Sequence, residues 1–123
     1  MPDVVEDDPL IPDTARLWRR IAPWQWVSDD AAAGGFRPSS SIFDDPELSV
    51  VLVDECSLEI LLAGHEGFGV AEFTAGEVRE RGWGLVRAPD DKLPGHCHVL
   101  GKKRRTLNGK FAKTCRVVRA PAV

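Results

Sequence analysis

Long hydrophobic runs are missing from this sequence. No apolar segment approaches the ~20 residues that a membrane-spanning helix requires. The opening stretch from Met1 to Asp8 is acidic, whereas a secretory signal begins basic and then becomes apolar. The sequence therefore predicts neither a membrane protein nor a secreted one, and we expect a cytoplasmic location.

Cysteine is scarce as well. The chain has 3 cysteines, Cys56, Cys97 and Cys115, with no CxxC spacing, and an odd number argues against a disulfide framework. We expect reduced, buried thiols. Cys97 stands between His96 and His98, but neighbours along a strand point to opposite faces, so neither imidazole is placed to activate the thiol.

Acidic residues are absent from the last part of the chain. Residues 1–91 hold all 19 acidic residues and 7 of the 16 basic ones, and residues 92–123 hold the other 9 basic residues. Two interpretations are open: the basic end folds back onto the acidic part, or it stays available for phosphate-bearing partners. We expect at most weak, salt-sensitive nucleic-acid binding, through Lys102, Lys103, Arg104 and Arg105.

Length and composition are those of an ordinary folded domain. A chain of 123 residues with 43% hydrophobic and 28% charged residues fits one domain that folds without metal or disulfides. Residues 1–14 are rich in acids and proline and predict a flexible acidic leader. Residues 15–123 predict a single globular domain.

Hydrophobic periodicity predicts an α+β domain with about five short strands and two or three short helices. The sheet is expected to be mixed or mostly antiparallel, with the β-branched run 48–53 at its centre and residues 22–41 as a long loop. Thr74 and Glu77 form a capping box at the start of a helix. Strands are predicted over 15–21, 48–53, 68–73, 83–87, 96–100 and 115–119. Helices are predicted over 55–63 and 74–82, with a further short helix over 102–113 interrupted at Asn108-Gly109.

The stretch Arg37-Pro-Ser-Ser-Ser41 has the composition of an anion cradle. Its hydroxyls and amides are donors, and the Arg37 guanidinium matches a phosphate or carboxylate. The alternative is an ordinary polar turn in which Arg37 pairs with Asp44, Asp45 or Glu47.

Three histidines raise the question of a metal. His96 and His98 share one face of a predicted strand, and His65 lies in a Gly-His-Glu-Gly turn, so the three imidazoles together fit a zinc ligand set. A His-x-His pair alone is weak evidence, because histidines at strand positions often bond to nearby backbone groups. We predict no metal site and no cofactor.

A series of short motifs runs from Leu17 to Lys102. They are Leu-Trp-Arg-Arg-Ile (17–21), Arg-Pro-Ser-Ser-Ser-Ile-Phe (37–43), Leu-Ser-Val (48–50), Gly-His-Glu-Gly-Phe-Gly (64–69) and His-Cys-His-Val-Leu-Gly-Lys (96–102). This pattern resembles an uncharacterised bacterial family of small hypothetical proteins, which implies no activity. A fainter similarity is to ADP-ribosyltransferase-like folds, which hold NAD with an early-strand arginine and a serine-rich strand, but their catalytic glutamate has no clear counterpart here.

Two function hypotheses follow from the residues. The first is a site for a phosphate-bearing ligand, a nucleotide or a nucleic-acid end, in which cations neutralise phosphate, serines orient it and histidines serve as acid and base. Its residues are Arg37, Ser39, Ser40 and Lys102 for binding and His65 and His96 for catalysis. The second is a non-enzymatic protein-interaction or accessory module, which the small size and the segregated charge favour. Whether the protein is an enzyme stays open at this point.

Overall fold

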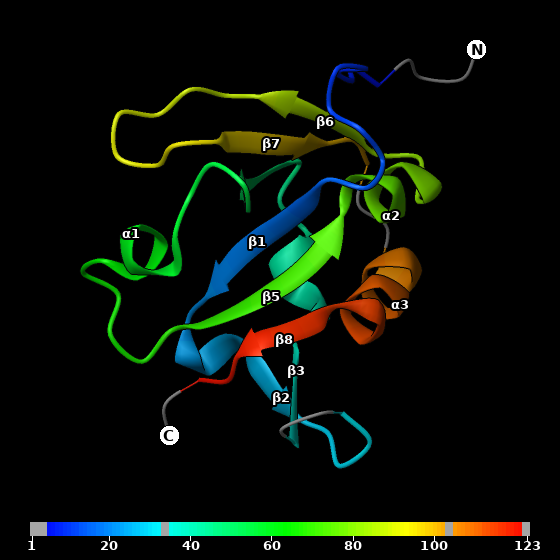
Figure 1. Ribbon diagram of the computed structural model, residues 1–123. Helices are drawn as coiled ribbons and strands as arrows, with labels where there is room; N and C mark the ends of the chain where they lie inside the picture. The colour runs from blue at the N-terminus through cyan, green and yellow to red at the C-terminus, as the bar shows by residue number, and fades with distance from the viewer. Residues whose placement is uncertain (1–4, 33–34, 103–104, 122–123) are drawn as a thin grey trace.

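The computed structural model describes residues 5–32, 35–102 and 105–121. Its main element is a six-stranded antiparallel sheet in the order β6-β7-β4-β1-β5-β8 (Figure 1). The strands are β1 (Arg16–Ile21), β4 (Glu47–Leu52), β5 (Gly69–Thr74), β6 (Gly84–Arg87), β7 (His96–Leu100) and β8 (Arg116–Arg119). A separate hairpin consists of β2 (Trp26–Ser28) and β3 (Phe36–Pro38), and the helices are α1 (Leu58–Leu62), α2 (Ala75–Glu80) and α3 (Arg105–Thr114). The predicted α+β class is confirmed.

The middle of the sheet is formed by β4 and β1. The β-branched run of β4 is buried on both faces: Val50 packs into one hydrophobic cluster and Val51 into another. A strand in this position has no face for charged residues, which explains its nearly continuous apolar sequence. The central position expected for this segment therefore agrees with the strand order.

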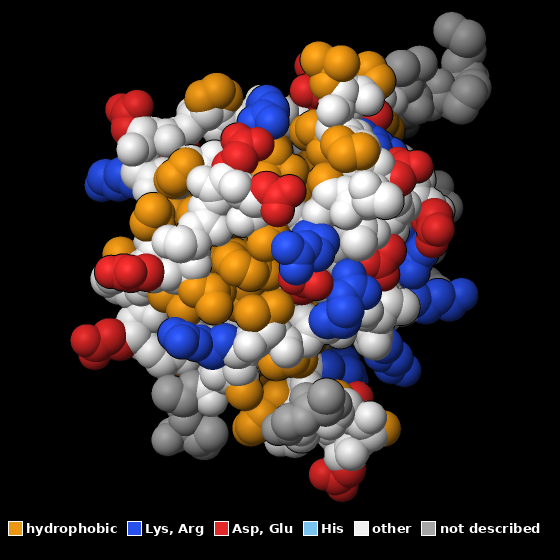
Figure 2. Space-filling view, viewed as in Figure 1, with side chains coloured by type: hydrophobic (Ala, Val, Ile, Leu, Met, Phe, Trp, Pro, Cys, Tyr) orange, Lys and Arg blue, Asp and Glu red, His pale blue; other side chains and the backbone are white. Residues whose placement is uncertain are grey.

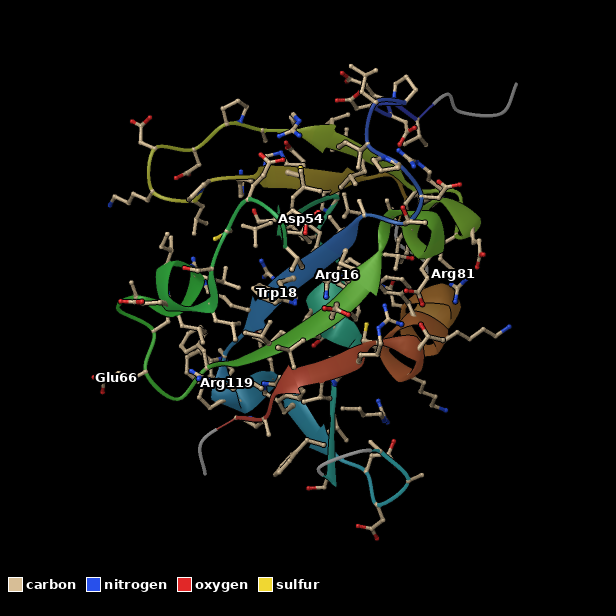
Figure 3. All side chains as sticks on the ribbon, in the orientation of Figure 1. Arg16, Trp18, Asp54, Glu66, Arg81 and Arg119 are labelled. Atoms are coloured by element: carbon tan, nitrogen blue, oxygen red, sulfur yellow. The ribbon has the colours of Figure 1, made fainter. Side chains whose placement is uncertain are left out.

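The larger hydrophobic cluster lies on the face of the sheet that α2, α3 and the 3-10 helix η3 (Ser40–Phe43) cover. Figure 1 shows η3 in teal behind β1 and β5. The smaller cluster lies on the opposite face, where Leu61 of α1 packs on Val51 and Val70, with Trp18 beside them. Figure 2 shows hydrophobic side chains gathered in the middle of this face, where Figure 3 places Trp18.

Local capping sets the starts of two helices. In α2, Thr74 Oγ1 accepts a hydrogen bond from Glu77 N at 3.2 Å and Glu77 Oε1 accepts one from Thr74 N at 2.9 Å, as the capping box predicts. In α1, Ser57 Oγ accepts from Ile60 N at 3.2 Å. This cap places the start of α1 at Leu58, three residues after the predicted start, because the preceding residues form a turn after β4.

The helix α3 is continuous, so the predicted interruption at Asn108-Gly109 is wrong. Asn108 is fully buried and its Nδ2 donates a hydrogen bond to Asp44 Oδ1 in the turn after η3. Phe111 and Ala112 are fully buried in the larger cluster. Tertiary packing of this face thus overrides the low helix propensity of asparagine and glycine.

Residues 22–32 and 35–41 have more regular structure than the predicted loop. They contain the β2–β3 hairpin, in which Val27 pairs with Arg37. Trp26 Nε1 donates to Ile21 O at 3.3 Å, and its indole lies so close to Gly69 that a Cβ there would overlap it. The hairpin is therefore anchored on the sheet by one tryptophan.

The acidic N-terminal segment lies along the outer edge of β6. Asp8 N donates to Leu85 O at 2.8 Å, and Asp7 Oδ1 accepts from Leu85 N at 3.0 Å. Arg79 of α2 binds Asp7 at 3.1 Å and Asp13 at 2.7 Å. These contacts join residues far apart in the sequence, which local composition cannot predict. No helix in the described part of the chain is long and apolar enough to cross a membrane.

The close approach of this segment gives a first prediction. A Cβ at Gly84 would overlap the carbonyl oxygen of Glu6, so Gly84→Ala should displace the segment and lower the free energy of unfolding by about 1–3 kcal/mol. Gly109→Ala is the control: it meets open space on α3 and should raise that free energy by about 0.5–1 kcal/mol. Urea denaturation measures both changes. Equal stability of Gly84→Ala and the wild type would show that the segment is not packed on β6.

Candidate site in the gap between β1 and β4

A gap opens between the two central strands. They pair only at Leu17↔Leu52 and Trp18↔Val51, and continuing this register would place Arg20 opposite Ser49. Instead, the guanidinium of Arg19 enters the gap and its Nη1 donates to Ser49 O at 3.0 Å. An arginine side chain thus bonds to a carbonyl that would otherwise face the neighbouring strand.

Arg19 is a partly buried cation with no carboxylate partner among the described residues. Burial lowers its pKa, the neighbouring charge of Arg20 lowers it further, and the charge of Asp45 opposes these effects. Its Nε is shielded from solvent and has no hydrogen-bond partner. Within the described residues neither Arg19 nor Arg20 forms an ion pair with a carboxylate; Arg20 Nη1 donates to Leu61 O at 2.9 Å. Charges removed from solvent are ordinarily paired, so two partly buried arginines without a direct ion pair leave this site with positive charge.

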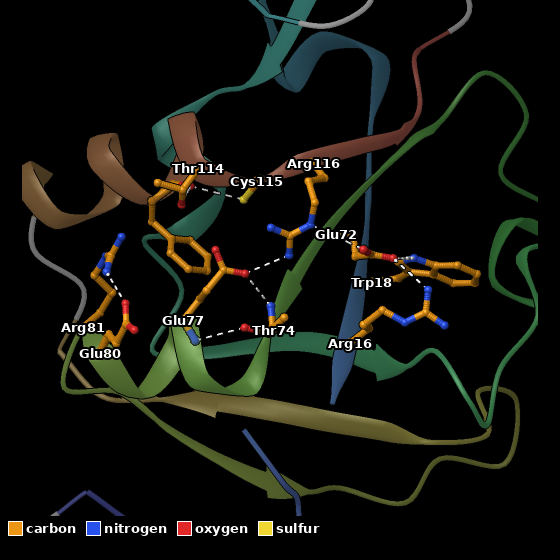
Figure 4. Close-up of polar contacts among 11 residues, drawn as sticks. Arg16, Trp18, Glu72, Thr74, Glu77, Glu80, Arg81, Thr114, Cys115 and Arg116 are labelled. Carbon is orange, nitrogen blue, oxygen red and sulfur yellow. Dashed lines mark hydrogen bonds and ion pairs between the residues drawn. The ribbon is translucent and has the colours of Figure 1, made fainter. Parts of the chain in front are cut away.

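Three other arginines of the sheet, Arg16, Arg87 and Arg116, are paired with carboxylates. Arg16 lies 3.8 Å from Glu72, and Arg116 lies 3.4 Å from the other oxygen of the same carboxylate (Figure 4). Arg87 at the end of β6 binds Glu55 at 2.8 Å. Arg19 differs from these three arginines, and its shielded Nε also lacks a hydrogen-bond partner.

A pocket lies at the gap. It is a small cavity of about 20 Å³, lined by both arginines together with Trp18, Ser49 and His96. A second pocket of about 470 Å³ is lined by Arg20, His65, Asp90 and Lys92. Arg20 and Leu93 line both pockets, so the two adjoin. We call them together the arginine cleft.

Two of the six predicted site residues, His65 and His96, line this cleft. His65 Nδ1 lies 2.9 Å from Ala63 O, and His96 Nδ1 bonds to Ala88 O. A carbonyl only accepts hydrogen bonds, so each Nδ1 carries a proton and each Nε2 is left to accept or donate one. Both imidazoles therefore have the form that general acid–base catalysis needs.

The other four predicted residues lie elsewhere. Arg37 is on β3 and binds Asp29 at 3.2 Å, so the pairing expected with Asp44, Asp45 or Glu47 is wrong. Its place opposite β2 brings it close to the acid that follows that strand.

The serines and Lys102 have structural surroundings. Ser39 caps η3 by accepting from Ser41 N, and its Oγ lies 2.9 Å from Ser41 Oγ, while Ser40 lies within η3. Lys102 follows β7 with its side chain exposed, and its carbonyl accepts from Trp83 Nε1 at 3.1 Å. Arg37, His65 and His96 line three different pockets, so the structure does not gather the predicted set.

The cysteines and histidines are the residues that could serve as a nucleophile or as metal ligands. Burial raises the pKa of Cys97 to about 11, and burial also raises the pKa of Cys56 and of Cys115, so these thiols are poor nucleophiles at neutral pH. Among residues 5–32, 35–102 and 105–121, no group of three histidines, cysteines or carboxylates is arranged to hold a metal ion. Lys103, Arg104 and the side chain of Arg105 lie outside the described residues.

Sequence reasoning missed Arg19, Arg20 and Lys92. The available signal was the pair Arg19-Arg20 inside a predicted strand. Adjacent strand residues point to opposite faces, so one arginine of such a pair must point toward a core. A buried arginine then indicates either an internal carboxylate or an anionic ligand.

The chain matches no protein-family model, and no curated protein or solved structure is significantly similar to it. The resemblance of its motifs to a bacterial family therefore stays a prediction, as does the cytoplasmic location. Function has to be inferred from the geometry and charge of the site.

Proposed function

We propose that the protein binds a phosphate-bearing ligand in the arginine cleft, with the anionic group held by Arg19 and Arg20. One observation carries this proposal: a solvent-shielded guanidinium nitrogen of Arg19 has no partner, and no ion pair neutralises either arginine within the described residues. Arg19 and Arg20 start from opposite faces of β1 and both line the pocket at the gap, where two guanidinium groups suit an oxyanion with several acceptor oxygens.

The volumes of the two pockets indicate which part of a ligand each pocket would hold. The cavity of about 20 Å³ beside Arg19 has room for one water-sized group, such as a phosphoryl oxygen. The adjoining pocket of about 470 Å³ has room for the rest of a small ligand. Lys92 at its rim adds a third positive charge, and Asp90 gives the rim one negative charge. His65 and His96 are the candidate acid and base.

Calorimetric titration with inorganic phosphate and pyrophosphate tests the proposal. We expect dissociation constants below about 1 mM, while chloride at equal ionic strength gives no heat of binding. Arg20→Gln should weaken binding at least about tenfold, because it removes one charged donor. Arg16→Gln, on the same strand but outside the cleft, should change the affinity less than about twofold. Equal affinity of both variants for phosphate would contradict the site.

A catalytic role has a separate test. Release of inorganic phosphate from a nucleoside diphosphate should be lost in His65→Gln while the affinity for pyrophosphate stays the same, because an acid–base residue contributes to turnover more than to binding. Binding without any release would make the protein a binding module rather than an enzyme.

A further inference from the structure

The two edges of the sheet differ. The outer edge of β6 is covered by the N-terminal segment, which bonds to Leu85 through Asp7 and Asp8. At the other edge, β8 has β5 as its single strand neighbour within the described residues. Most of its side chains are exposed, and its backbone groups on the outer side face no other strand. An open edge of this kind is a template for another strand.

A basic groove lies beside this open edge. It has a volume of about 510 Å³ and runs between β8 with the end of α3 on one side and the β2–β3 hairpin on the other. Three cations line it, Arg37, Lys113 and Arg116, against one acid, Asp29. Arg37 is paired with Asp29 and Arg116 with two glutamates, so Lys113 is the lining cation without a carboxylate partner in the described part of the chain.

A β-bulge in the β5–β8 pair places both arginines of β8 on the same face. The register shifts between Val70 and Ala71, so that Arg116 pairs with Glu72 and Arg119 pairs with Val70. Glu72 and Val70 are two residues apart and share one face, so both arginines lie on that face (Figure 3 labels Arg119).

The two ends of the edge each have an available cation. Arg116 is held by Glu72 at 3.4 Å and by Glu77 at 2.8 Å. Lys113 before the strand and Arg119 at its end are exposed and have no carboxylate partner within the described residues. A partner with negative charge at both ends would meet both cations.

The sequence of β8 disfavours pairing with a second copy of itself. Arg-Val-Val-Arg reads the same in both directions, so an antiparallel copy would place Arg116 opposite Arg119 twice. Like charges in directly opposite positions destabilise a strand pair. The bulge puts Arg116 and Arg119 on one face, so a strand that reads acid, apolar, acid would instead place an opposite charge beside each of them.

We propose that the outer edge of β8 binds an extended acidic segment of a partner protein as an additional strand. Backbone hydrogen bonds to the edge supply affinity in this mode, and the flanking cations select acidic residues. The edge is only four residues long, so the complex is weak and sensitive to salt. This surface involves none of the residues assigned to the arginine cleft.

Fluorescence anisotropy with labelled peptides tests the proposal. A peptide with a Val-Glu-Val-Glu-Val core, which has both glutamates on one face, should bind with a dissociation constant on the order of 10–100 μM at low salt. The same peptide N-methylated at alternate residues keeps its charge but cannot form the strand ladder, and it should bind at least about tenfold more weakly. Equal binding of the two peptides, or of one with lysine in place of glutamate, would overturn the proposal.

Substitutions in the protein test whether the peptide binds at the outer edge of β8. Val118→Pro removes one backbone donor of β8 at the bulge of this edge strand, where proline is tolerated, and should weaken binding, whereas Val118→Thr should keep it. Lys113→Gln should weaken binding about three- to tenfold, and Lys110→Gln, on the same helix but outside the groove, should not. Wild-type affinity in both Val118→Pro and Lys113→Gln, or displacement of the peptide by single-stranded DNA with no effect of N-methylation, would refute strand addition.

Discussion

Replacing Phe111 with alanine is expected to lower the free energy of unfolding by about 3–5 kcal/mol. The side chain is fully buried in α3, and its ring centroid lies 5.0 Å from Phe43, 4.8 Å from Phe73 and 5.2 Å from Trp83. Truncation removes the ring that joins η3, β5 and α3, and leaves a cavity between elements that already pack on the sheet. A loss of this size is a large part of the 5–15 kcal/mol that stabilises an ordinary domain.

Urea denaturation followed by tryptophan fluorescence measures this loss. Phe68→Ala is the matched control, because Phe68 is only partly buried and contacts His65 and Trp24 at the surface, so its loss should cost about 1 kcal/mol. If the two variants have the same stability, α3 is not packed into the larger hydrophobic cluster.

Much of the sheet was predictable because its signals are local. The β-branched run at β4, the alternation in β7 and the capping box at Thr74 and Glu77 are each contained within a few residues, and the structure has all of them. The continuity of α3 was not predictable in this way. It depends on burying Asn108 against Asp44, residues that are 64 positions apart.

The residues of the candidate site were likewise predictable only in part. Residue type and spacing led to His65 and His96, which line the cleft, but also to Arg37 and Lys102, which do not. Which side chains share a cleft depends on strand order: β7 lies two strands from β1, whereas the hairpin that carries Arg37 is a separate two-stranded sheet that lines the groove beside β8. Strand order is set by packing across the whole sheet, and no motif encodes it.

Arg19→Met is expected to have opposite effects in the absence and in the presence of phosphate. In chloride, the substitution replaces a desolvated, unpaired charge with an apolar side chain of similar length, which should raise the free energy of unfolding by about 1–2 kcal/mol despite the lost hydrogen bond to Ser49 O. At a phosphate concentration of about 100 times the dissociation constant, binding should stabilise the wild type by about 2.7 kcal/mol and the variant hardly at all. The order of stability should therefore reverse.

Urea denaturation of both proteins in chloride and in phosphate at equal ionic strength shows whether the order reverses. Arg16→Met provides the reference, because Arg16 is exposed and ion-paired with Glu72, so its loss should change stability by less than about 0.5 kcal/mol in either salt. A variant Arg19→Met that is less stable than the wild type in both salts would mean that Arg19 serves only to support the gap between β1 and β4. A variant more stable in both salts would mean that the buried charge is a defect that no phosphate relieves. Only the reversal is consistent with an arginine kept in a costly position because a ligand neutralises it.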